Sequence, residues 1–309
     1  VFDGFENQEE LNYYYPTNVL VTGWDIMFFW VARMIMAGYE WSPELLNGLE
    51  NGRPFNDVFF TGMVRDNKRR KMSKSLGNSP EALELIKKYG ADGVRYGILS
   101  CTAAGSDIIF DAPSDPKTGK TLNESQLCLQ GSKFCNKMWN ALRLIKGLDV
   151  VDQPANEISQ LAAIWFENKL QQTIEEVEKS MKDYRLSEAL MTLYNFIWGD
   201  FCSWYLEMIK PKYEKPIDKA SLLRSKEMLT SLIKLLHPFA PFITEELFQV
   251  VNTDKSIMLQ EFDKSLPLTN SYGDEGLELI SVIRNIRNTK NIPFKNGLEI
   301  VINTENVEA

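Results

Sequence analysis

The chain has 309 residues, of which 44% are hydrophobic and 25% are charged, and its formal net charge is -8. This composition predicts a globular protein of about two domains. It argues against a membrane protein, because no apolar run approaches the roughly 20 residues that a spanning helix needs. The four cysteines show no C-x-x-C spacing, which argues against a zinc site or a disulfide framework and favours reduced thiols in a cytoplasmic protein.

The first part of the chain has the order of elements that is typical of α/β proteins. Residues 18–22 predict a short buried strand, after which Gly23 turns the chain. Asp25 predicts the N-cap of a helix over residues 26–37. Residues 57–61 predict a second strand. In open parallel sheets nucleotides bind beyond the carboxyl ends of the strands, so the ends of these two strands are candidate positions for a ligand.

A basic loop follows the second predicted strand. Residues 65–74 carry six cations against a single carboxylate, Asp66, in a chain that is acidic overall. Local positive charge of this kind indicates an anionic partner. The loop includes the run K-M-S-K-S at residues 71–75, whose ammonium groups and hydroxyls suit a polyphosphate. For an isolated pentapeptide a solvated loop is the commoner explanation, but the flanking strands favour phosphate binding.

Two short helices and a loop follow. Ser79 predicts the N-cap of a helix over residues 80–89, and residues 91–100 predict a second helix packed behind the basic loop. Residues 111–119 are rich in Pro, Gly, Asp and Ser, as loops are, and predict a domain boundary.

The second half of the chain predicts long helices, because its apolar residues recur at intervals of three and four. These predicted helices cover residues 123–146, 161–181, 186–210 and 220–236, with a shorter one from Thr244. Together they predict an all-α helical bundle. Its aromatic residues Trp198, Trp204 and Tyr205 are expected mostly in the core, although aromatic rings also stack on RNA bases. Near the end, a basic edge suits either an RNA backbone or a solvated face; it consists of Arg284, Arg287 and Lys290.

Three of these runs carry a resemblance to a known family. The K-M-S-K-S run, after T-G-M-V at residues 61–64, resembles the second signature of class I aminoacyl-tRNA synthetases. The run Y-P-T at residues 15–17, followed by G-W-D-I-M-F-F-W-V-A-R-M at residues 23–34, resembles the valine-specific members. Isoleucine-specific members usually show glutamine, histidine and arginine after the same Gly-x-Asp, and this chain does not. The run H-P-F-A-P-F-I-T-E-E-L at residues 237–247 resembles a stretch of the helical anticodon-binding domain in the same subgroup.

The resemblance implies both an architecture and an activity. It implies a Rossmann-type catalytic portion over residues 1–115, a helical anticodon-binding domain over residues 116–270, and a basic helix with a junction region over residues 271–309. The implied activity is the activation of valine with ATP, accompanied by Mg²⁺, and the transfer of valine to tRNA(Val). A monomer is expected, with no metal held by this chain alone.

Individual residues of the K-M-S-K-S loop acquire roles through the same resemblance. Lys71 and Lys74 would hold the phosphates of ATP while the valine carboxylate displaces pyrophosphate, with Lys74 at the transition state. Met72, Ser73 and Ser75 would belong to the same ATP-binding loop. A serine in a loop can hydrogen-bond to its own turn as readily as to a phosphate, so the two serines are weaker candidates.

Five further positions match the family pattern near the ends of the two strands. Gly23 would let the backbone approach the adenosine, and Asp25 would accept hydrogen bonds from the ribose hydroxyls. Met63 and Val64 would meet the adenine ring through backbone groups. Trp30 would form the wall of the amino acid pocket, although its position alone predicts the buried side of an amphipathic helix.

The first signature of the class, His-x-Gly-His, does not occur, since the only histidine is His237. A structural role at a helix boundary is expected for that residue. The chain begins at Val1 without an initiator methionine or a targeting segment, which predicts a piece of a larger protein. Without His-x-Gly-His, this piece is expected to be inactive by itself. A non-catalytic RNA-binding module and an isoleucine-specific relative are the alternatives.

Overall fold

The computed structural model describes residues 8–45, 52–103, 105–212, 214–252, 255–261, 273–293 and 295–301. The chain divides into two compact units. Unit 1 consists of Val1–Lys133 with Lys179–Met191, and unit 2 consists of Phe134–Glu178 with Thr192–Ala309. The three-part division predicted from the sequence, with its boundaries at residues 115 and 270, stays a prediction.

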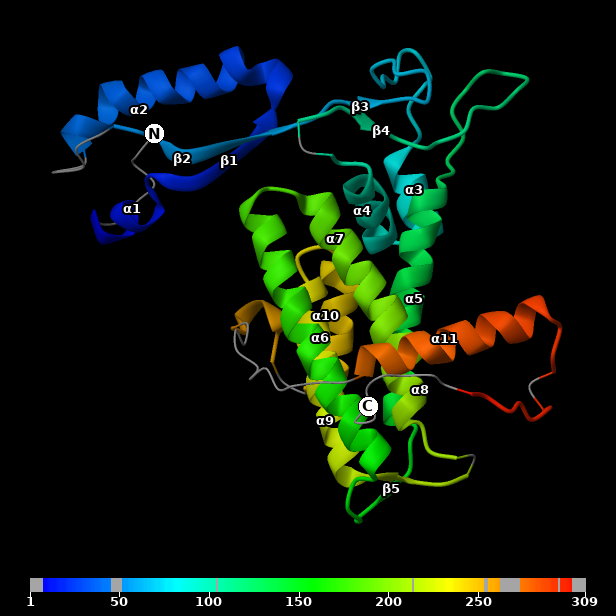
Figure 1. Ribbon diagram of the computed structural model, residues 1–309. Coiled ribbons are helices and arrows are strands. Elements are labelled where there is room, and N and C mark those ends of the chain that lie inside the picture. The colour runs from blue at the N-terminus through cyan, green and yellow to red at the C-terminus, as the bar shows by residue number, and fades with distance from the viewer. Residues whose placement is uncertain are drawn as a thin grey trace. The chain divides into compact units, whose positions relative to one another are not determined.

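Unit 1 begins with helix α1 (Gln8–Tyr14) and a pair of parallel strands. Strand β1 (Thr17–Gly23) pairs with β2 (Phe55–Thr61), so that Gly23 lies opposite Thr61 at the carboxyl ends. Parallel strands need a crossover connection, and helix α2 (Ala32–Leu45), which runs alongside the two strands, is part of it (Figure 1). Both predicted strands are confirmed. The expected burial of the first is wrong, because a sheet of two strands leaves most of β1 accessible.

The chain leaves β1 through two irregular turns of helix. A 3₁₀ helix, η1 (Trp24–Ile26), is followed by a π-helix, η2 (Met27–Val31), before α2 begins. The N-cap position of η1 is Gly23, and no side chain caps it. The predicted capping role of Asp25 is therefore wrong, because the helical turn begins at Trp24 and Asp25 is its second residue. Irregular helical turns of this kind are frequent at functional sites.

The rest of unit 1 packs two helices behind a second pair of short strands. Strand β3 (Val64–Arg65) pairs in parallel with β4 (Ile108–Ile109). The segment Lys179–Met191 also belongs to the unit, as do helices α3 (Ala82–Tyr89) and α4 (Ala91–Ser100) and the first part of α5 (Gln126–Lys146). They share a small core that consists of Leu85, Tyr89, Val94, Phe110, Ala112 and Cys128.

The bounds of α3 correct one prediction and confirm another. The helix begins at Ala82 with Glu81 in the N-cap position, so the predicted cap at Ser79 is wrong. The Ser79 hydroxyl instead donates to the Pro80 carbonyl at 3.3 Å, which leaves it unable to cap a later turn. The predicted end at Tyr89 is confirmed: Gly90 follows with φ 79°, a left-handed conformation that glycine adopts at little cost.

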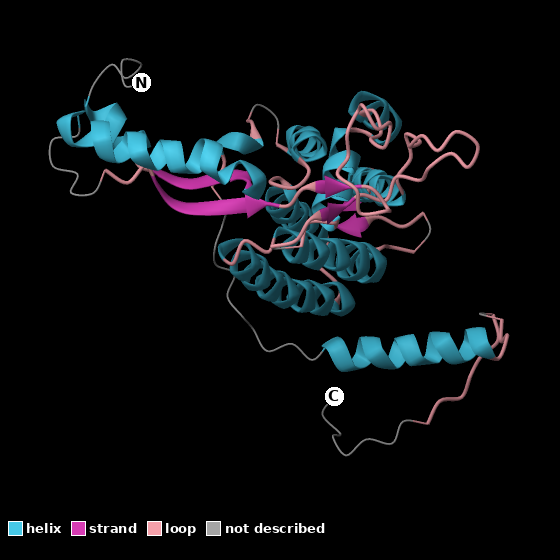
Figure 2. Ribbon diagram, turned by 90° about the horizontal axis from the view of Figure 1, so that it is seen from above, coloured by secondary structure: helices cyan, strands magenta, loops and turns pink. Residues whose placement is uncertain are grey.

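Unit 2 is built mainly of helices, and Figure 2 shows how few of the ribbons are strands. Its elements are the end of α5, most of α6 (Glu157–Lys182), the end of α7 (Leu186–Asn195), the π-helix η3 (Phe196–Tyr205), α8 (Leu206–Ile209), α9 (Lys219–Leu236), α10 (Pro241–Val251), η4 (Ile257–Leu259), α11 (Gly273–Thr289) and one parallel pair, β5 (Val150–Val151) with β6 (Ile217–Asp218). Within the described ranges, no helix has the length and apolarity to cross a membrane.

An aromatic cluster forms the core of unit 2. The ring of Phe166, fully buried in α6, lies 5.0 Å from Phe196, 5.4 Å from Phe201 and 4.8 Å from Tyr205, measured between ring centroids. A continuous α-helix was predicted over this segment. The π-helix replaces it because residues five apart, such as Phe196 and Phe201, then share a face and meet the same partner ring.

The three aromatic residues singled out in the sequence have different environments. Tyr205 is fully buried and its hydroxyl bonds to the Ser225 hydroxyl at 2.8 Å, which confirms the prediction of a core position. Trp198 and Trp204 are half-buried, and each ring lies beneath a cation. Lys137 Nζ is 5.4 Å from the Trp198 ring centroid, and the Arg284 guanidinium is 4.8 Å from that of Trp204.

Candidate nucleotide-binding site

The K-M-S-K-S loop is held at its base by two buried polar residues, Asp66 and Asn78, which are 7% and 2% exposed. The Asn78 amide nitrogen donates to the Asp66 carboxylate at 3.0 Å and to the Lys71 carbonyl at 3.1 Å. The Asn78 amide oxygen accepts from the Ser73 backbone N–H at 2.8 Å. Because one side chain bonds to both the start and the middle of the loop, it determines how the loop leaves the strand.

Asp66 folds the turn that precedes the loop. Its carboxylate accepts from the backbone N–H groups of Lys68 and Arg70, at 3.0 and 2.8 Å, and from the Arg70 guanidinium at 2.9 Å. Burial alone would raise the pKa of Asp66, but the hydrogen bonds from Asn78 and Arg70 outweigh it and hold the pKa well below the ordinary range. The stability that this lowered pKa contributes is present at neutral pH and is lost only in strong acid.

Replacing Asn78 with alanine is expected to loosen the loop without unfolding unit 1. The change removes three hydrogen bonds and leaves the buried Asp66 carboxylate short of a donor, which costs about 1–3 kcal/mol. Hydrogen–deuterium exchange of the peptide that contains Ser73 should therefore be faster. The matched control is Asn136→Ala at an exposed position of α5. Equal exchange in the wild type and Asn78→Ala would contradict this role of Asn78.

The turn after β1 and the K-M-S-K-S loop come close together. Lys71 Nζ lies 3.5 Å from Asp25 Oδ2, although the two residues are 46 positions apart in the chain. Both side chains are exposed, so the ion pair contributes little to stability. The ion pair matters because it brings together the turn after β1 and the K-M-S-K-S loop, the two segments for which the sequence predicts a shared ATP ligand.

Two glycines allow the close approach of segments around this site. A Cβ atom at Gly23 would lie 2.7 Å from the Asp25 carboxylate, and one at Gly62 would lie 1.9 Å from the backbone carbonyl of Ser106. Only glycine fits at position 62, because the obstructing atom is backbone and has no other rotamer to adopt.

Asp107 is an anchor that the sequence did not reveal. Its carboxylate accepts from the Met63 backbone N–H at 2.9 Å and from the Trp24 indole N–H at 3.3 Å, and it forms an ion pair with Arg65. The bonds from Met63 and Arg65 lower the pKa of Asp107, so it stays charged at neutral pH. No local pattern marks this residue, because all its partners lie more than 40 positions away.

The backbone groups of Met63 and Val64 are largely used within the chain. The Met63 N–H donates to Asp107, and the Met63 carbonyl accepts from the Ile108 N–H at 2.9 Å. The Val64 carbonyl accepts from the Met72 N–H at 3.1 Å. An adenine contact through these groups stays a prediction, and it requires that a ligand share or replace these bonds.

The remaining loop residues differ in what they contact. The Met72 side chain packs against the core of unit 1 and so anchors the loop. Ser73 and Ser75 bond to each other through their hydroxyls at 2.7 Å. Lys74 is exposed and has no ion pair among the described residues. Of the two lysines, Lys74 is therefore the one whose charge is not already compensated.

Trp30 lies on the exposed surface of η2, with 56% of its area accessible. The burial expected from its position in a helix is wrong, because the chain is π-helical there and Val31 is the buried residue of that turn. No hydrogen bond, ion pair or ring contact between described residues joins Trp30 to the K-M-S-K-S loop. A role in an amino acid pocket stays a prediction.

The basic edge of α11 is mostly used inside unit 2. Arg284 lies over the Trp204 ring, and Arg287 donates to the carbonyls of Pro293 and Asn296, each at 2.9 Å. Both sequence interpretations of this edge, an RNA-backbone contact and a solvated face, stay predictions, and an RNA contact would have to share these two arginines with their partners in the chain. Lys290 is exposed.

The single histidine has the structural role that its position predicts. His237 is the C-cap residue of α9, and its Nδ1 lies 2.7 Å from the Thr244 hydroxyl in α10. That hydroxyl also donates to the Ala240 carbonyl at 2.7 Å, and the other ring nitrogen of His237, Nε2, lies 2.9 Å from the Met258 sulfur. The ring joins the end of one helix to the start of the next.

A metal bound by protein side chains alone is not indicated within the described ranges, where no three His, Cys, Asp or Glu residues lie close enough together to hold an ion. Mg²⁺ in ATP sites is usually bound by phosphates, waters and only one or two carboxylates. An ion that arrives with a nucleotide would therefore be held mainly by the phosphates and by water.

Comparisons with known proteins match both parts of the chain. The family described as tRNA synthetases class I (I, L, M and V) matches residues 1–111, and the anticodon-binding domain of tRNA ligase matches residues 163–302. Valine–tRNA ligases of Parabacteroides distasonis, Phocaeicola vulgatus and Fusobacterium nucleatum are 48%, 49% and 38% identical to it. These alignments cover 100%, 98% and 98% of the chain. The chain spans about a third of the length of these relatives, at 34%, 33% and 34%.

Solved structures of class I synthetases share the fold. A leucyl-tRNA synthetase of Agrobacterium radiobacter, in a ternary complex with tRNA and LeuAMS, has a TM-score of 0.58 at 17% identity and covers 92% of this chain and 36% of its own. A methionyl-tRNA synthetase of Mycobacterium tuberculosis, bound by methionyl-adenylate, has a TM-score of 0.53 at 18% identity and covers 87% of this chain and 52% of its own. The chain therefore belongs to the class I tRNA synthetases and is similar along its whole length to valine–tRNA ligases.

Proposed function

We propose that this chain supplies the ATP-phosphate loop and the anticodon-binding bundle of a valine–tRNA ligase. The observation that carries the proposal is the approach of Lys71 to Asp25, which joins the K-M-S-K-S loop to the Gly-x-Asp turn after β1. The identity to valine–tRNA ligases over the whole chain supports valine as the amino acid. The whole protein would activate valine with ATP to valyl-adenylate and transfer it to tRNA(Val).

The proposed architecture has three parts. Residues 1–115 would belong to a Rossmann-type catalytic domain, which the parallel pairing of β1 with β2 supports. Residues 116–270 would form the all-α anticodon-binding domain, and residues 271–309 would begin a junction region. A monomeric state and a cytoplasmic location are proposed with them, and the four free thiols suit a reducing compartment.

The proposed chemistry at the loop is electrostatic. A carboxylate oxygen of valine attacks the α-phosphorus of ATP in line, and pyrophosphate leaves with the electrons of the broken P–O bond. Lys74 would meet the charge that develops on the leaving pyrophosphate, since its ammonium group has no competing carboxylate among the described residues. Asp66 and Asn78 would hold the loop in place, so that little reorganisation is needed during the reaction.

Binding of ATP would rearrange the ion pair of the free chain. Lys71 would exchange Asp25 for the phosphates, which frees the Asp25 carboxylate to accept hydrogen bonds from the ribose hydroxyls. Mg²⁺ would arrive with the nucleotide and neutralise phosphate charge. Met72, Ser73 and Ser75 would complete the phosphate loop, with the methionine as its anchor and the two hydroxyls as donors.

The other proposed contacts concern adenosine and valine. Gly23 would let the backbone approach the adenosine, because a glycine has no side chain to stand between them. Met63 and Val64 would lie beside the adenine ring. Trp30 would form a flat wall against the branched side chain of valine, and its exposure in this chain leaves the ring accessible to a ligand. Such a pocket discriminates by only about 1–3 kcal/mol per methylene.

Anticodon binding is tested by fluorescence titration of the chain with a valine tRNA transcript and with the same transcript carrying an altered anticodon. The valine transcript is expected to bind tighter, and its affinity should fall steeply with salt, because the acidic chain binds RNA through local patches. Equal affinity for both transcripts would contradict anticodon recognition. A flat salt dependence would contradict binding through phosphates.

A second candidate function is an RNA-binding module without catalysis. The observation that favours it is the lack of His-x-Gly-His, because His237 is the only histidine and is bonded to Thr244. ATP–pyrophosphate exchange distinguishes the two. The chain alone is expected to be inactive under both hypotheses, whereas the full-length protein exchanges pyrophosphate only if it is the ligase.

A further inference from the structure

A hairpin beyond β4 lies against the K-M-S-K-S loop. This segment, the 113–122 hairpin, closes through an antiparallel bridge between Ser114 and Thr121, and the Leu122 N–H donates to the Pro113 carbonyl at 2.8 Å. The Thr121 N–H also donates to the carbonyl of Gly77, just after the loop, at 3.1 Å. The hairpin is therefore bonded to the segment that carries the candidate phosphate ligands.

The tip of the hairpin is an ordered turn. Asp115 Oδ1 accepts from the Lys117 N–H and Asp115 Oδ2 accepts from the Thr118 hydroxyl, both at 2.8 Å. Gly119 has φ 70°, and its N–H donates to the Asp115 carbonyl at 2.8 Å. The Asp115 carboxylate therefore forms its hydrogen bonds within the turn. These bonds hold the backbone that carries Lys117 and Lys120.

The basic turn before the loop is bonded to the same hairpin. The Asn67 side chain donates to the carbonyl of Ala112, at the base of the hairpin, at 3.0 Å. Turn 66–70, loop 71–77 and the 113–122 hairpin are therefore three segments of unit 1 joined by hydrogen bonds.

These segments carry unpaired positive charge. Asp66, Asp25 and Asp107 are paired with Arg70, Lys71 and Arg65. The carboxylate of Asp115 in the hairpin is the one anion of these segments without an ion pair among the described residues. Against it stand five exposed cations without an ion pair in the same described ranges; they are Lys68, Arg69, Lys74, Lys117 and Lys120. Although the whole chain has a net charge of -8, these cations form a locally positive surface that suits a polyanion longer than a nucleotide.

We propose that the 113–122 hairpin binds the phosphate backbone of the acceptor stem of a tRNA through Lys117 and Lys120. The inference rests on the proposed function. Transfer of valine needs the 3′ end of the tRNA beside the adenylate that the K-M-S-K-S loop helps to form. The RNA nearest to the hairpin is therefore the stem that carries this end. Lysine ammonium groups on a fixed turn bind phosphates without reading bases.

The test is a titration of the 309-residue chain with two RNAs, an acceptor-stem minihelix and the anticodon stem-loop of the same tRNA. The variant Lys117→Ala/Lys120→Ala is expected to bind the minihelix on the order of tenfold more weakly at 0.1 M salt. The slope of log K against log salt should fall by about 2, which is about 1 for each lysine. Binding of the anticodon stem-loop should be unchanged.

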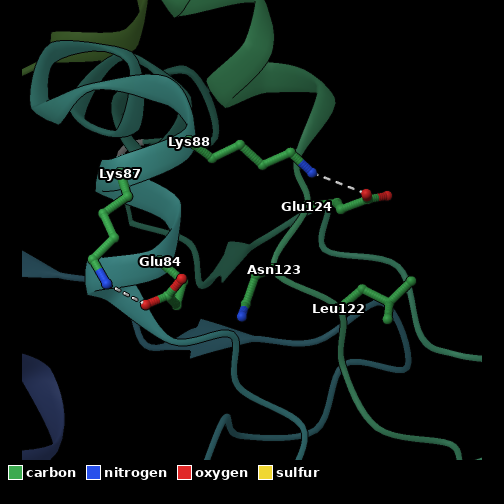
Figure 3. A pocket seen from close by; sticks show the side chains of 6 residues that line it. All are labelled: Glu84, Lys87, Lys88, Leu122, Asn123 and Glu124. Carbon is green, nitrogen blue, oxygen red and sulfur yellow. Dashed lines mark hydrogen bonds and ion pairs between the residues drawn. The ribbon is translucent and has the colours of Figure 1, made fainter.

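The matched control is Lys87→Ala/Lys88→Ala, which makes the same change in net charge in the same unit. These lysines of α3 line a pocket together with residues 122–124, and each has a carboxylate partner, Glu84 at 2.7 Å for Lys87 and Glu124 at 2.9 Å for Lys88 (Figure 3). The control is expected to bind the minihelix like the wild type. Equal weakening in both double variants would show an effect of overall charge and would overturn the proposal. So would undiminished binding in Lys117→Ala/Lys120→Ala, or a wild-type chain that does not bind the minihelix.

Failure of this inference and failure of the proposed function give different results. If the chain is not part of a valine–tRNA ligase, it will not distinguish the valine anticodon from an altered one. If only the hairpin assignment is wrong, that distinction remains and the lysine variant binds the minihelix like the wild type.

Discussion

Replacing Lys74 with alanine, in the full-length protein that contains this chain, is expected to slow valyl-adenylate formation by about 10²- to 10³-fold. Lys74 is the exposed loop lysine without a carboxylate partner among the described residues, so its charge is available to the leaving pyrophosphate. An interaction that strengthens as charge develops lowers the barrier without tightening the ground state. The loss should therefore appear in kcat, with little change in the KM for ATP.

The measurement is ATP–pyrophosphate exchange at saturating valine, with ATP varied. Lys71→Ala provides a comparison within the loop and is expected to lose less in kcat and more in KM, because Lys71 trades one partner, Asp25, for the phosphates. Lys87→Ala is the control for charge, since this lysine lies on α3 and pairs with Glu84. A Lys74→Ala variant that raises KM with kcat unchanged would show uniform binding of ATP and would refute the transition-state role.

The second large effect concerns stability. Replacing Phe166 with alanine is expected to destabilise unit 2 by about 3–5 kcal/mol. The ring is fully buried among Phe196, Phe201 and Tyr205, so its removal leaves a cavity that a bundle of long helices closes only in part. Aromatic contacts at these centroid distances add about 0.5–1.5 kcal/mol per pair beyond burial.

Urea unfolding, followed by circular dichroism at 222 nm, measures this effect. If unfolding shows two transitions, the one that shifts is assigned with the valine tRNA titration, because binding should be lost at the same urea concentration as unit 2. Phe242→Ala in α10 is the control, because this ring is largely exposed and its loss should cost about 0.5 kcal/mol or less. A shift in Phe166→Ala no larger than that of the control would mean that the aromatic cluster is not the core of unit 2.

Local patterns were sufficient where a structure depends on neighbours in the chain. The strands at residues 17–23 and 55–61 follow from short apolar runs, and the end of α3 follows from Gly90. The long helices of unit 2 follow from apolar residues at intervals of three and four. The caps at Asp25 and Ser79 were predicted wrongly, because a cap depends on the residue at which a helix starts, and that start is poorly determined by periodicity.

Burial was less predictable than secondary structure. The helical pattern of η2 suggested a buried Trp30, and the apolar run of β1 suggested a buried strand, yet both are accessible. An apolar pattern indicates which face of a helix or strand can be buried. Whether another element covers that face depends on the whole chain.

The family resemblance, the two strands, the helical second half and the K-M-S-K-S loop could all be inferred from contiguous residues. Three features could be seen only in the folded chain: Asp66 and Asn78 hold the loop, Asp107 anchors Met63, and the 113–122 hairpin bonds to Gly77. The bond from Met63 to Asp107 joins residues 44 positions apart, so it forms only when the intervening chain has folded. The bond from Asn78 to Asp66 spans 12 positions, but it depends on the path of the loop between them, and nothing in the spacing of either residue specifies its partner.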